Sequence, residues 1–474
     1  MTLTPITILA ATKGLVIAPA GCGKTQLIVD TLKQSKGKPT LVLTHTNAGV
    51  MALRERFGRA AISSSLYRLS TVDAFAIRLV LAYPQRTGLS FDPAANQIPY
   101  KNIRHTAAKL IHSGALDDIL KATYQRVLVD EYQDCSIQQH NVVKVLARRL
   151  PTCVFGDPLQ AIFGFGDDLL PEWVTVVEAE FPKLGELSTP WRWKNLGADD
   201  LGQWVLDVRA ALLSGNAIDL RTGGPRVHWR QLTGDPAKDI VAQVNEQYRV
   251  EKDPKDRLLI IGDSRRVATR HEYARSAQGV GVVERVDLTD LVNWATQIEA
   301  AGQGQDLFDA VIGFAKEVVV NLGSDKLTQR IDVIRRGKNT KPPTPDELAA
   351  LAVVNGGGIA ESVAFLLTLR EDKYKRIFRA GLFWPMIDAM NQVVANPATS
   401  LRDAAVKVKE AGRFLGRKLP AKAVGSTLLL KGLESDHALI LDAGSMDASH
   451  LYVALSRGAK SVTVFSNNPV LKPS

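Results

Sequence analysis

The stretch GLVIAPAGCGKT occupies residues 14–25 and decides the fold. It begins with a continuous apolar run, continues through Gly21 and Gly23, and ends with Lys24 and Thr25. The residues that follow, QLIVDTLKQ, have the apolar spacing of a helix. A buried strand, a glycine-rich turn and a helix in this order form a phosphate-binding loop, in which backbone N–H groups and the helix N-terminus surround phosphate oxygens.

The residues of this loop are candidate ligands of a nucleoside triphosphate. Lys24 is predicted to neutralise charge on the β- and γ-phosphates, and Thr25 is predicted to bind Mg²⁺. The candidate nucleotide contacts in the loop are Ala20, Gly21, Cys22, Gly23, Lys24, Thr25 and Gln26.

A second apolar run, RVLVD at residues 126–130, ends in the adjacent acids Asp130 and Glu131. Ligands of parallel sheets bind beyond the carboxyl ends of the strands, so two acids at such an end favour metal-dependent hydrolysis. Asp130 is predicted to hold Mg²⁺ through its water shell, and Glu131 is predicted to orient and deprotonate the attacking water. These segments predict a nucleoside triphosphatase, with a P-loop kinase or a metabolic enzyme as an alternative at this point.

Further apolar runs indicate a fold of the α/β class. They are continuous rather than alternating, which is typical of parallel strands covered by helices on both faces. These runs occupy residues 40–44, 152–156, 258–262, 438–442 and 461–465. Their grouping predicts two domains, 1–186 and 187–474. The first domain has a small insertion at about residues 76–122, and the second has a mostly helical insertion at about 292–420.

The composition narrows the class of protein. Of the 474 residues, 45% are apolar and 23% are charged, as in an ordinary globular protein. Three scattered cysteines, Cys22, Cys135 and Cys153, are too few for a disulfide framework or a zinc site, which indicates a reducing compartment. No apolar run approaches the roughly eighteen residues that span a membrane, and no secretory signal is recognisable. We expect a cytoplasmic protein rather than a secreted, membrane-bound, fibrous or disordered one.

Positive charge is concentrated in one part of the chain. The net charge is +10, and residues 326–425 hold eighteen Lys and Arg against nine Asp and Glu. A focused basic surface favours a partner that bears phosphates, and a solvated helical face without a partner is the alternative. Within this region KYKRIFR (373–379) makes Lys373, Lys375 and Arg376 candidate contacts to a nucleic acid strand. A basic amphipathic helix with its aromatic residues in the core explains the same pattern equally well.

Six further segments, in order from residue 43 to residue 460, resemble motifs of the UvrD/Rep-type superfamily-1 DNA helicases. They are LTHTNAGVMALRERF (43–57), DEYQDCSIQQ (130–139), GDPLQAIFGFG (156–166), LSTPWR (187–192), KGLE (431–434) and LYVALSRGAK (451–460). Each string alone is weak, but the ordered set is strong, and the chain is identified as a compact member of this family with reduced accessory domains. The resemblance implies two RecA-like P-loop NTPase domains with parallel sheets, which use ATP and Mg²⁺.

The resemblance also implies roles for residues that act on the triphosphate. Gln160, together with Gln133, is expected to sense the γ-phosphate or the attacking water. Arg192 and Arg457 are fixed cations that are expected to reach the γ-phosphate, where an arginine contributes roughly 10³ to 10⁵ in rate.

Three more residues are implied at the base and the ribose. Trp191 is expected to stack on the base, although a tryptophan in the core fits the same position. Gly432 and Glu434 of the KGLE segment are expected to contact the nucleotide, with Glu434 at the ribose.

The DNA contacts implied by the resemblance come from three motifs. They are His45, Thr46 and Asn47, then Thr71 and Asp73 of STVDAF (70–75), and Phe165. The ring of Phe165 would stack on bases without reading their sequence, and packing in the core is the alternative.

The resemblance implies an ATP-dependent helicase or translocase that moves 3′–5′ on single-stranded DNA and separates duplex strands. The reduced accessory domains leave a second function open, an ATP-gated DNA sensor or regulatory subunit that works with a separate nuclease, for example in antiphage defence. The implied partners are single-stranded DNA, tailed duplex DNA and a protein, either a nuclease or a replication or repair factor. The expected location is the cytoplasm of a bacterial or phage-infected cell.

Overall fold

The computed structural model describes residues 3–91, 98–164, 168–250, 253, 255–284, 288–412 and 420–473. Within these ranges the chain alternates between strands and helices for most of its length, except for a long, mostly helical stretch over residues 289–412 that contains only the two short strands β11 (Val319–Val320) and β12 (Arg376–Ile377). None of the helices in the described ranges combines the length and the apolar character needed to cross a bilayer.

The first sheet has six strands, and every neighbouring pair in it is parallel. Its strands in spatial order are β3 (Tyr67–Thr71), β2 (Thr40–Thr44), β4 (Arg126–Val129), β5 (Thr152–Gly156), β1 (Lys13–Ile17) and β6 (Lys183–Glu186). The apolar runs that the sequence places at 40–44, 126–130 and 152–156 are therefore central strands, and the run at 14–18 is β1.

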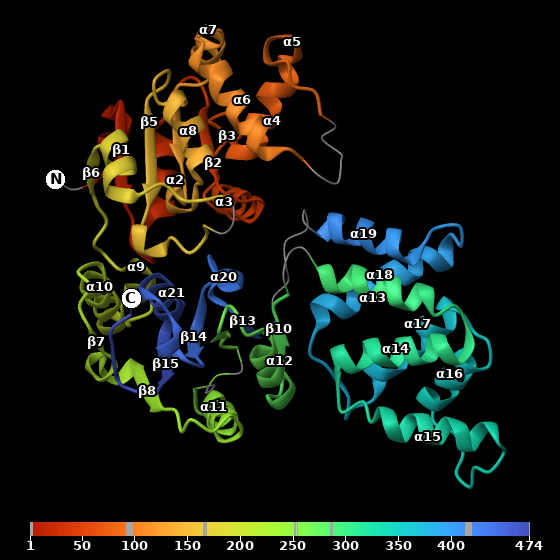
Figure 1. Ribbon diagram of the computed structural model, residues 1–474. Helices are drawn as coiled ribbons and strands as arrows, with labels where there is room; N and C mark the ends of the chain where they lie inside the picture. The colour runs from red at the N-terminus through yellow and green to blue at the C-terminus, as the bar shows by residue number, and fades with distance from the viewer. Residues whose placement is uncertain are drawn as a thin grey trace. The chain divides into compact units, whose positions relative to one another are not determined.

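Different helices bury the two faces of this sheet (Figure 1). Along β1, Ile17 packs in one apolar cluster and Val16 in the other, because successive side chains of a strand point to opposite faces. The covering helices are α6 (Tyr100–His112) and α8 (Ile137–Leu146) on the first face, and α2 (Lys24–Gln34) and α3 (Asn47–Arg59) on the second. Burial on both sides explains why the central strands are continuously apolar.

The second sheet also has six strands, in the order β10-β13-β9-β14-β15-β8. Their bounds are β10 (Val280–Val282), β13 (Lys422–Ser426), β9 (Leu258–Gly262), β14 (Ser435–Ile440), β15 (Gly458–Ser466) and β8 (Val227–Gln231). The pairs β10–β13, β13–β9, β14–β15 and β15–β8 are parallel. The prediction of an α/β fold with two parallel sheets of the RecA-like type is confirmed.

The chain divides into two compact units, Met1–Gln231 with Gly432–Ser474, and Leu232–Lys431. The first unit holds the complete first sheet together with β8, β14 and β15, so the phosphate-binding loop and the motifs of residues 431–460 fall almost entirely within it. The second unit holds β9, β10 and β13 and the mostly helical stretch. The predicted domain boundary after residue 186 stays a prediction.

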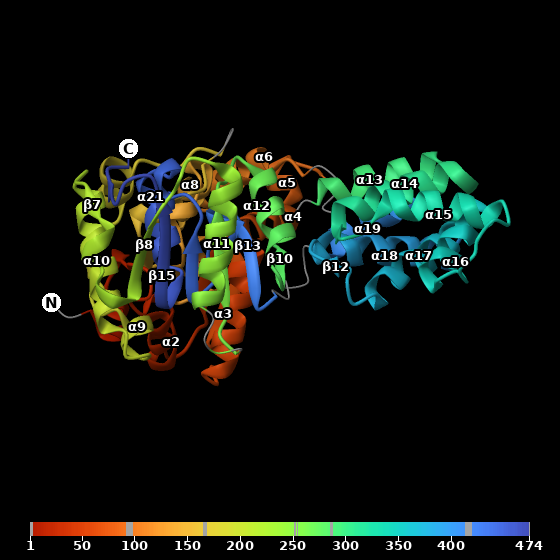
Figure 2. The same ribbon diagram turned by 90° about the horizontal axis from the view of Figure 1, so that it is seen from below.

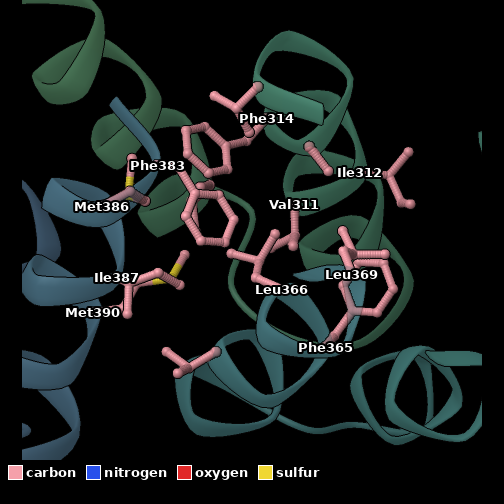
Figure 3. Close-up of a cluster of buried hydrophobic side chains, with 14 of the residues drawn as sticks. Val311, Ile312, Phe314, Phe365, Leu366, Leu369, Phe383, Met386, Ile387 and Met390 are labelled. Atoms are coloured by element: carbon pink, nitrogen blue, oxygen red, sulfur yellow. The ribbon is translucent and has the colours of Figure 1, made fainter. Parts of the chain in front are cut away.

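Seven helices form a bundle within the second unit (Figures 1 and 2). They are α13 (Thr289–Ala300), α14 (Gly304–Val318), α15 (Ser324–Arg335), α16 (Pro345–Val354), α17 (Ile359–Glu371), α18 (Ala380–Ala395) and α19 (Leu401–Gly412). Phe314, Phe365, Phe383 and Met386 are fully buried among them (Figure 3). This bundle occupies most of the stretch in which the sequence predicts a helical insertion, and it has an apolar core of its own.

Candidate nucleotide-binding site

The phosphate-binding loop connects β1 to α2 through two glycines in left-handed conformations. Gly21 has a φ of 71° and Gly23, the N-cap of α2, has a φ of 90°. L-residues rarely adopt such angles, which explains why glycine occupies both positions. A Cβ atom at Gly21 would also lie 2.6 Å from Cζ3 of Trp193, so the close approach of residues 191–193 requires glycine there as well.

The first turn of α2 presents backbone donors to the loop. Among the described residues, no acceptor bonds the N–H groups of Gly23, Lys24, Thr25 or Gln26. Unpaired N–H groups at the start of a helix, together with the helix dipole, form a binding site for phosphate. This geometry fits the triphosphate of a nucleotide.

Lys24 lies beside the acidic pair that ends β4. Its Nζ is 2.9 Å from Oδ1 of Asp130, and it also forms an ion pair with Glu131. Burial disfavours the charged form of Lys24, but the two carboxylates outweigh this effect and raise its pKa. Burial raises the pKa of Asp130, and the nearby ammonium of Lys24 opposes that shift. The structure therefore brings together the predicted cation, metal ligand and base.

Glu131 adopts a strained backbone conformation. Its φ is 53°, in the left-handed region, which costs a residue other than glycine on the order of 1–3 kcal/mol. This conformation turns the chain sharply after β4, and a short 3₁₀ helix, Tyr132–Asp134, follows. Nε2 of Gln133 donates to Oε2 of Glu131 at 2.5 Å, so the turn also orients the carboxylate.

Gln160 is held by a hydrogen bond to Asp157. Nε2 of Gln160 donates to Oδ2 of Asp157 at 3.0 Å, and the backbone N–H of Asp157 donates to Oε1 of Gln133 at 3.3 Å. Asp157 is in turn bonded by Arg209 of α10 (Asp199–Leu213), whose Nε lies 3.1 Å from both carboxylate oxygens. These bonds link Gln133 and Gln160, the two residues expected to sense the γ-phosphate.

Arg209 is a residue that the sequence motifs do not identify. It is 6% exposed, and its NH1 also donates to Glu186 at 2.7 Å. A signal does exist in the sequence, because Arg209 lies next to Val208 and four residues after Val205 on the buried face of its helix. A charged residue on an apolar helix face requires an internal partner.

Trp191, Arg192 and Trp193 of α9 (Trp191–Lys194) lie against the phosphate-binding loop. The backbone N–H of Arg192 donates to the carbonyl of Gly21 at 3.1 Å, and a Cβ at Gly23 would lie 3.0 Å from Cδ1 of Trp191. Trp191 is 48% exposed, whereas Trp193 is fully buried and donates through Nε1 to the carbonyl of Gly458. Trp193 is therefore the core tryptophan of this segment, and Trp191 has a free surface beside the loop.

The two candidate arginines differ in their surroundings. Arg192 forms an ion pair with Glu434 at 2.5 Å. Arg457 is 3% exposed and donates to the carbonyls of Val453 and Leu433. Burial, reinforced by the positive charge of Arg192, lowers the pKa of Arg457 to about 10.

The segment that contains Arg457 also contacts the loop directly. Tyr452 lies on α21 (Ala448–Leu455), and its hydroxyl accepts a hydrogen bond from the N–H of Ala20 at 3.0 Å. Burial raises the pKa of Tyr452 well above its usual value, so its hydroxyl keeps its proton. Tyr452 belongs to the motif LYVALSRGAK, but the sequence alone indicates no role for it.

Several predicted DNA contacts in the first unit have partners inside the protein. The hydroxyls of Thr46 and Thr71 cap α3 and α4 (Val72–Ala82) by accepting from the N–H groups three residues later. Nδ1 of His45 lies 3.2 Å from Oε1 of Gln139. Asp73 forms a bidentate ion pair with Arg104, and Phe165 lies outside the described residues.

The basic segment 373–379 is a turn followed by the short strand β12 (Arg376–Ile377), so the alternative of an amphipathic helix there is wrong. Nζ of Lys375 lies 2.6 Å from Asp346 and 3.2 Å from Asp372. Arg376 donates to the backbone carbonyls of Val280 and Ala274. Of the three candidate strand contacts here, only Lys373 is exposed and outside an ion pair among the described residues.

Comparisons with known proteins agree with this site. A family model described as the UvrD/REP helicase N-terminal domain matches residues 93–167. An ATP-dependent helicase/nuclease subunit from Lactococcus lactis subsp. lactis (strain IL1403) is 26% identical over 142 residues, which cover 26% of this chain and 12% of that protein.

Two solved helicase structures are similar to this chain at a lower level. The arterivirus nonstructural protein 10 (helicase) matches with a TM-score of 0.32 and 8% identity over 97% of this chain and 60% of its own. The Pif1 helicase from Candida albicans matches with a TM-score of 0.28 and 14% identity over 53% of this chain and 56% of its own. Both TM-scores are low, so neither structure supports the assignment. The family model and the Lactococcus relative show that parts of this chain are similar to UvrD/REP-type helicases, in agreement with the resemblance of the ordered motifs, and the chain spans only a small part of that relative's length.

Proposed function

We propose that this protein is an ATP-dependent DNA helicase or translocase that moves 3′–5′ on single-stranded DNA and separates duplex strands. The observation that supports this proposal most is the arrangement at the start of α2. Four unpaired N–H groups and Lys24 face the site from the loop, and the carboxylates of Asp130 and Glu131 lie next to Lys24. A phosphate-binding loop beside an acidic pair is the arrangement that nucleotide hydrolysis requires.

The chemistry assigns one task to each of these residues. The loop N–H groups and Lys24 bind the β- and γ-phosphates of ATP. Thr25 and Asp130 are the residues that would hold Mg²⁺, which supplies charge neutralisation at the phosphates. The carboxylate of Glu131 accepts a proton as the water oxygen bonds to the γ-phosphorus and the bond to the β–γ bridging oxygen breaks. ADP and inorganic phosphate are the products.

Arg192, Arg457 and Gln160 would complete the site on the triphosphate. In the structure the guanidinium of Arg192 is paired with Glu434, and its backbone is bonded to the loop at Gly21. We assign Arg192 and Arg457 to charge stabilisation at the γ-phosphate, Trp191 to stacking on the base, and Glu434 with Gly432 to the ribose side. These groups belong to the segments 187–192 and 431–460, so hydrolysis would depend on residues from both RecA-like parts of the chain.

We propose single-stranded DNA and tailed duplexes as the substrates, with His45, Thr46, Asn47, Thr71, Asp73, Phe165 and Lys373 as strand contacts. Thr46 and Asn47 are exposed at the start of α3, which supports contact with a strand. A protein partner, such as a nuclease or a repair factor, and a cytoplasmic location also remain proposals. The relative from Lactococcus is named as one component of a helicase/nuclease, which supports a search for such a partner.

The first test measures phosphate release from ATP in the presence of Mg²⁺, with and without single-stranded DNA, and then strand displacement on 3′- and 5′-tailed duplexes. We expect hydrolysis that single-stranded DNA stimulates, and displacement only from the 3′-tailed duplex. The reason is that a motor of this type couples each round of hydrolysis to movement along the bound strand.

Each other outcome has a defined meaning. Stimulated hydrolysis without displacement from either duplex would instead support an ATP-gated DNA sensor that works with a separate nuclease. The small insertion between α4 and β4 favours this second function, because its described residues, which leave out 92–97, form only α5 (Pro84–Thr87), α6 and α7 (Asp117–Thr123). Hydrolysis that DNA does not change would contradict both.

A further inference from the structure

Arg209 lies on the buried face of α10, and its side chain reaches the residue that follows β5. The buried apolar residues on the same face of α10 include Leu201, Val205, Val208 and Leu212. A guanidinium among apolar side chains is costly to bury unless charged partners bond it. The place of Arg209 in the fold therefore depends on the carboxylates that it contacts.

Two carboxylates hold this guanidinium. Nε of Arg209 lies 3.1 Å from both carboxylate oxygens of Asp157, NH2 lies 3.0 Å from Oδ1, and NH1 donates to Glu186 at 2.7 Å. Burial disfavours the charged form of Arg209, but Asp157, with support from Glu186, outweighs this effect and raises its pKa. Because the side chain is only 7% exposed and is bonded to these two carboxylates, Arg209 would act on a bound nucleotide only through them.

Asp157 transmits this constraint to Gln160. The side chain of Asp157 is 0% exposed, and its Oδ2 accepts a hydrogen bond from Nε2 of Gln160 at 3.0 Å. The other oxygen, Oδ1, accepts from Arg209 and from the backbone N–H of Leu159 at 3.3 Å. A carboxylate that is bonded at both oxygens keeps one orientation, so these contacts fix the place of Oδ2.

The bond to Asp157 decides which way the amide of Gln160 faces. An ionised carboxylate only accepts hydrogen bonds, so it bonds the NH₂ group of the amide and not its oxygen. The amide oxygen is thereby directed away from Asp157. The attacking water of the proposed reaction carries O–H donors, and the oxygen is the end of the amide that can accept one.

Gln133 is held by a different part of the same aspartate. Its Oε1 accepts from the backbone N–H of Asp157 at 3.3 Å, and its Nε2 donates to Glu131 at 2.5 Å. A Cβ at Gly156 would lie 2.8 Å from this Oε1, so the backbone itself fits closely against the amide of Gln133. A change confined to the side chains around Asp157 should therefore leave Gln133 in place.

We propose that Arg209 is a positioning residue for ATP hydrolysis: through the side chain of Asp157 it fixes the amide of Gln160 in the orientation that accepts a hydrogen bond from the attacking water. This inference rests on the proposed function, in which Gln160 acts on the triphosphate. Lysine cannot replace Arg209 here, because one ammonium lacks the planar fork that bonds both oxygens of a carboxylate together. A structural role alone, in which Arg209 only holds α10 in place, predicts a different result.

The test measures kcat and the KM for ATP, with Mg²⁺ and single-stranded DNA, for Arg209→Lys, Gln160→Met and the double variant. Titration with a fluorescent ADP analogue counts the folded sites, so that kcat refers to folded protein. We expect Arg209→Lys to lower kcat about tenfold while KM changes less than about twofold, because it misplaces a group that acts in the transition state. In the Gln160→Met protein, Arg209→Lys should lower kcat less than about twofold further, because the amide that Arg209 positions is already absent.

The matched control is Arg221→Lys at the exposed pair with Asp219, which should have the kcat of the unchanged protein. If Arg209→Lys does not fold, Asp157→Asn takes its place. This substitution keeps the size of the side chain but supplies an N–H donor beside Gln160, so the amide can turn round. The same loss of kcat is expected, again without a further loss in the Gln160→Met protein.

The other outcomes separate this inference from the proposed function. An unchanged kcat in Arg209→Lys, or equal losses with and without Gln160, would show a structural role and overturn the inference while hydrolysis itself stands. An unchanged kcat in Gln160→Met would also overturn it, because the amide would then have no task in the reaction. An unchanged protein that does not hydrolyse ATP would overturn the proposed function and the inference together.

Discussion

Lys24 is the single residue on which the nucleotide proposal depends most. Its ammonium lies 2.9 Å from Asp130 and also contacts Glu131, beside the unpaired N–H groups of α2. We expect Lys24→Ala to lower the rate of ATP hydrolysis by about 10²- to 10³-fold, because it removes a fixed donor that faces the charge of the γ-phosphate. The measurement is phosphate release at saturating ATP, Mg²⁺ and single-stranded DNA.

Lys33→Ala serves as the control for this change. Lys33 is exposed in the last turn of the same helix, away from the loop, so its removal should leave the rate close to that of the unchanged protein. Circular dichroism of both variants separates a loss of catalysis from a loss of folding. A Lys24→Ala protein that hydrolyses ATP at the unchanged rate would place the nucleotide elsewhere.

The sequence predicts the residues of the nucleotide site unevenly. Lys24, Asp130 and Glu131 can be found because local rules place them, a loop before a helix and acids at the end of a strand. Tyr452 and Arg209 could not be found in this way. Their partners, Ala20 and Asp157, lie far away in the sequence, and only the folded chain brings each pair within hydrogen-bond distance.

At the scale of elements, Arg209 ties α10 to the segment that follows β5. The side chain of its partner Asp157 is 0% exposed, and that of Arg209 is 7% exposed. We expect Arg209→Met to lower the free energy of unfolding by about 3–5 kcal/mol, because a buried carboxylate then lacks its counterion. Urea denaturation followed by circular dichroism measures this change.

A second substitution tests the cause of that loss. Arg209→Met combined with Asp157→Asn removes the uncompensated charge, so the double variant should be more stable than Arg209→Met alone. Arg221→Met at the exposed pair with Asp219 should have little effect. Equal stability of the single variant and the unchanged protein would mean that the buried pair does not hold α10 in place.

Whole strands divide into those that sequence patterns predict and those that they do not. The central strands β1, β2, β4 and β5 each contain three consecutive apolar residues and are buried at nearly every position, because helices cover both of their faces. The edge strands β3, β6 and β8 are missed, since much of each is only partly buried and they carry polar residues there. A strand at the edge of a sheet therefore lacks the continuous apolar pattern, and its own residues do not show that it is a strand.

At the scale of the whole molecule, the folded chain redistributes the charge that the sequence concentrates in residues 326–425. Lys375 is paired with Asp346 and Asp372, and Arg379 with Glu284 and Asp290. Two basic residues of KYKRIFR thus neutralise carboxylates inside the second unit. The net charge of a sequence segment is therefore a poor guide to how many of its cations can reach a phosphate.

Lys373 and Lys375 form a matched pair for testing where strand binding occurs. We expect Lys373→Ala to weaken binding of single-stranded DNA and to reduce the slope of log affinity against log salt concentration by roughly 0.7, the value for one lost phosphate contact on a single strand. Lys375→Ala should leave this slope unchanged and instead lower the free energy of unfolding, because Asp346 and Asp372 then lose their shared cation. Anisotropy titrations over a range of salt concentrations and urea denaturation measure the two effects.

The reverse result, a reduced slope for Lys375→Ala with unchanged stability, would show that Lys375 leaves its carboxylates to bind DNA. An unchanged slope for both variants would mean that neither lysine contacts a DNA phosphate. The second unit would then contact DNA through other residues or bind a protein partner.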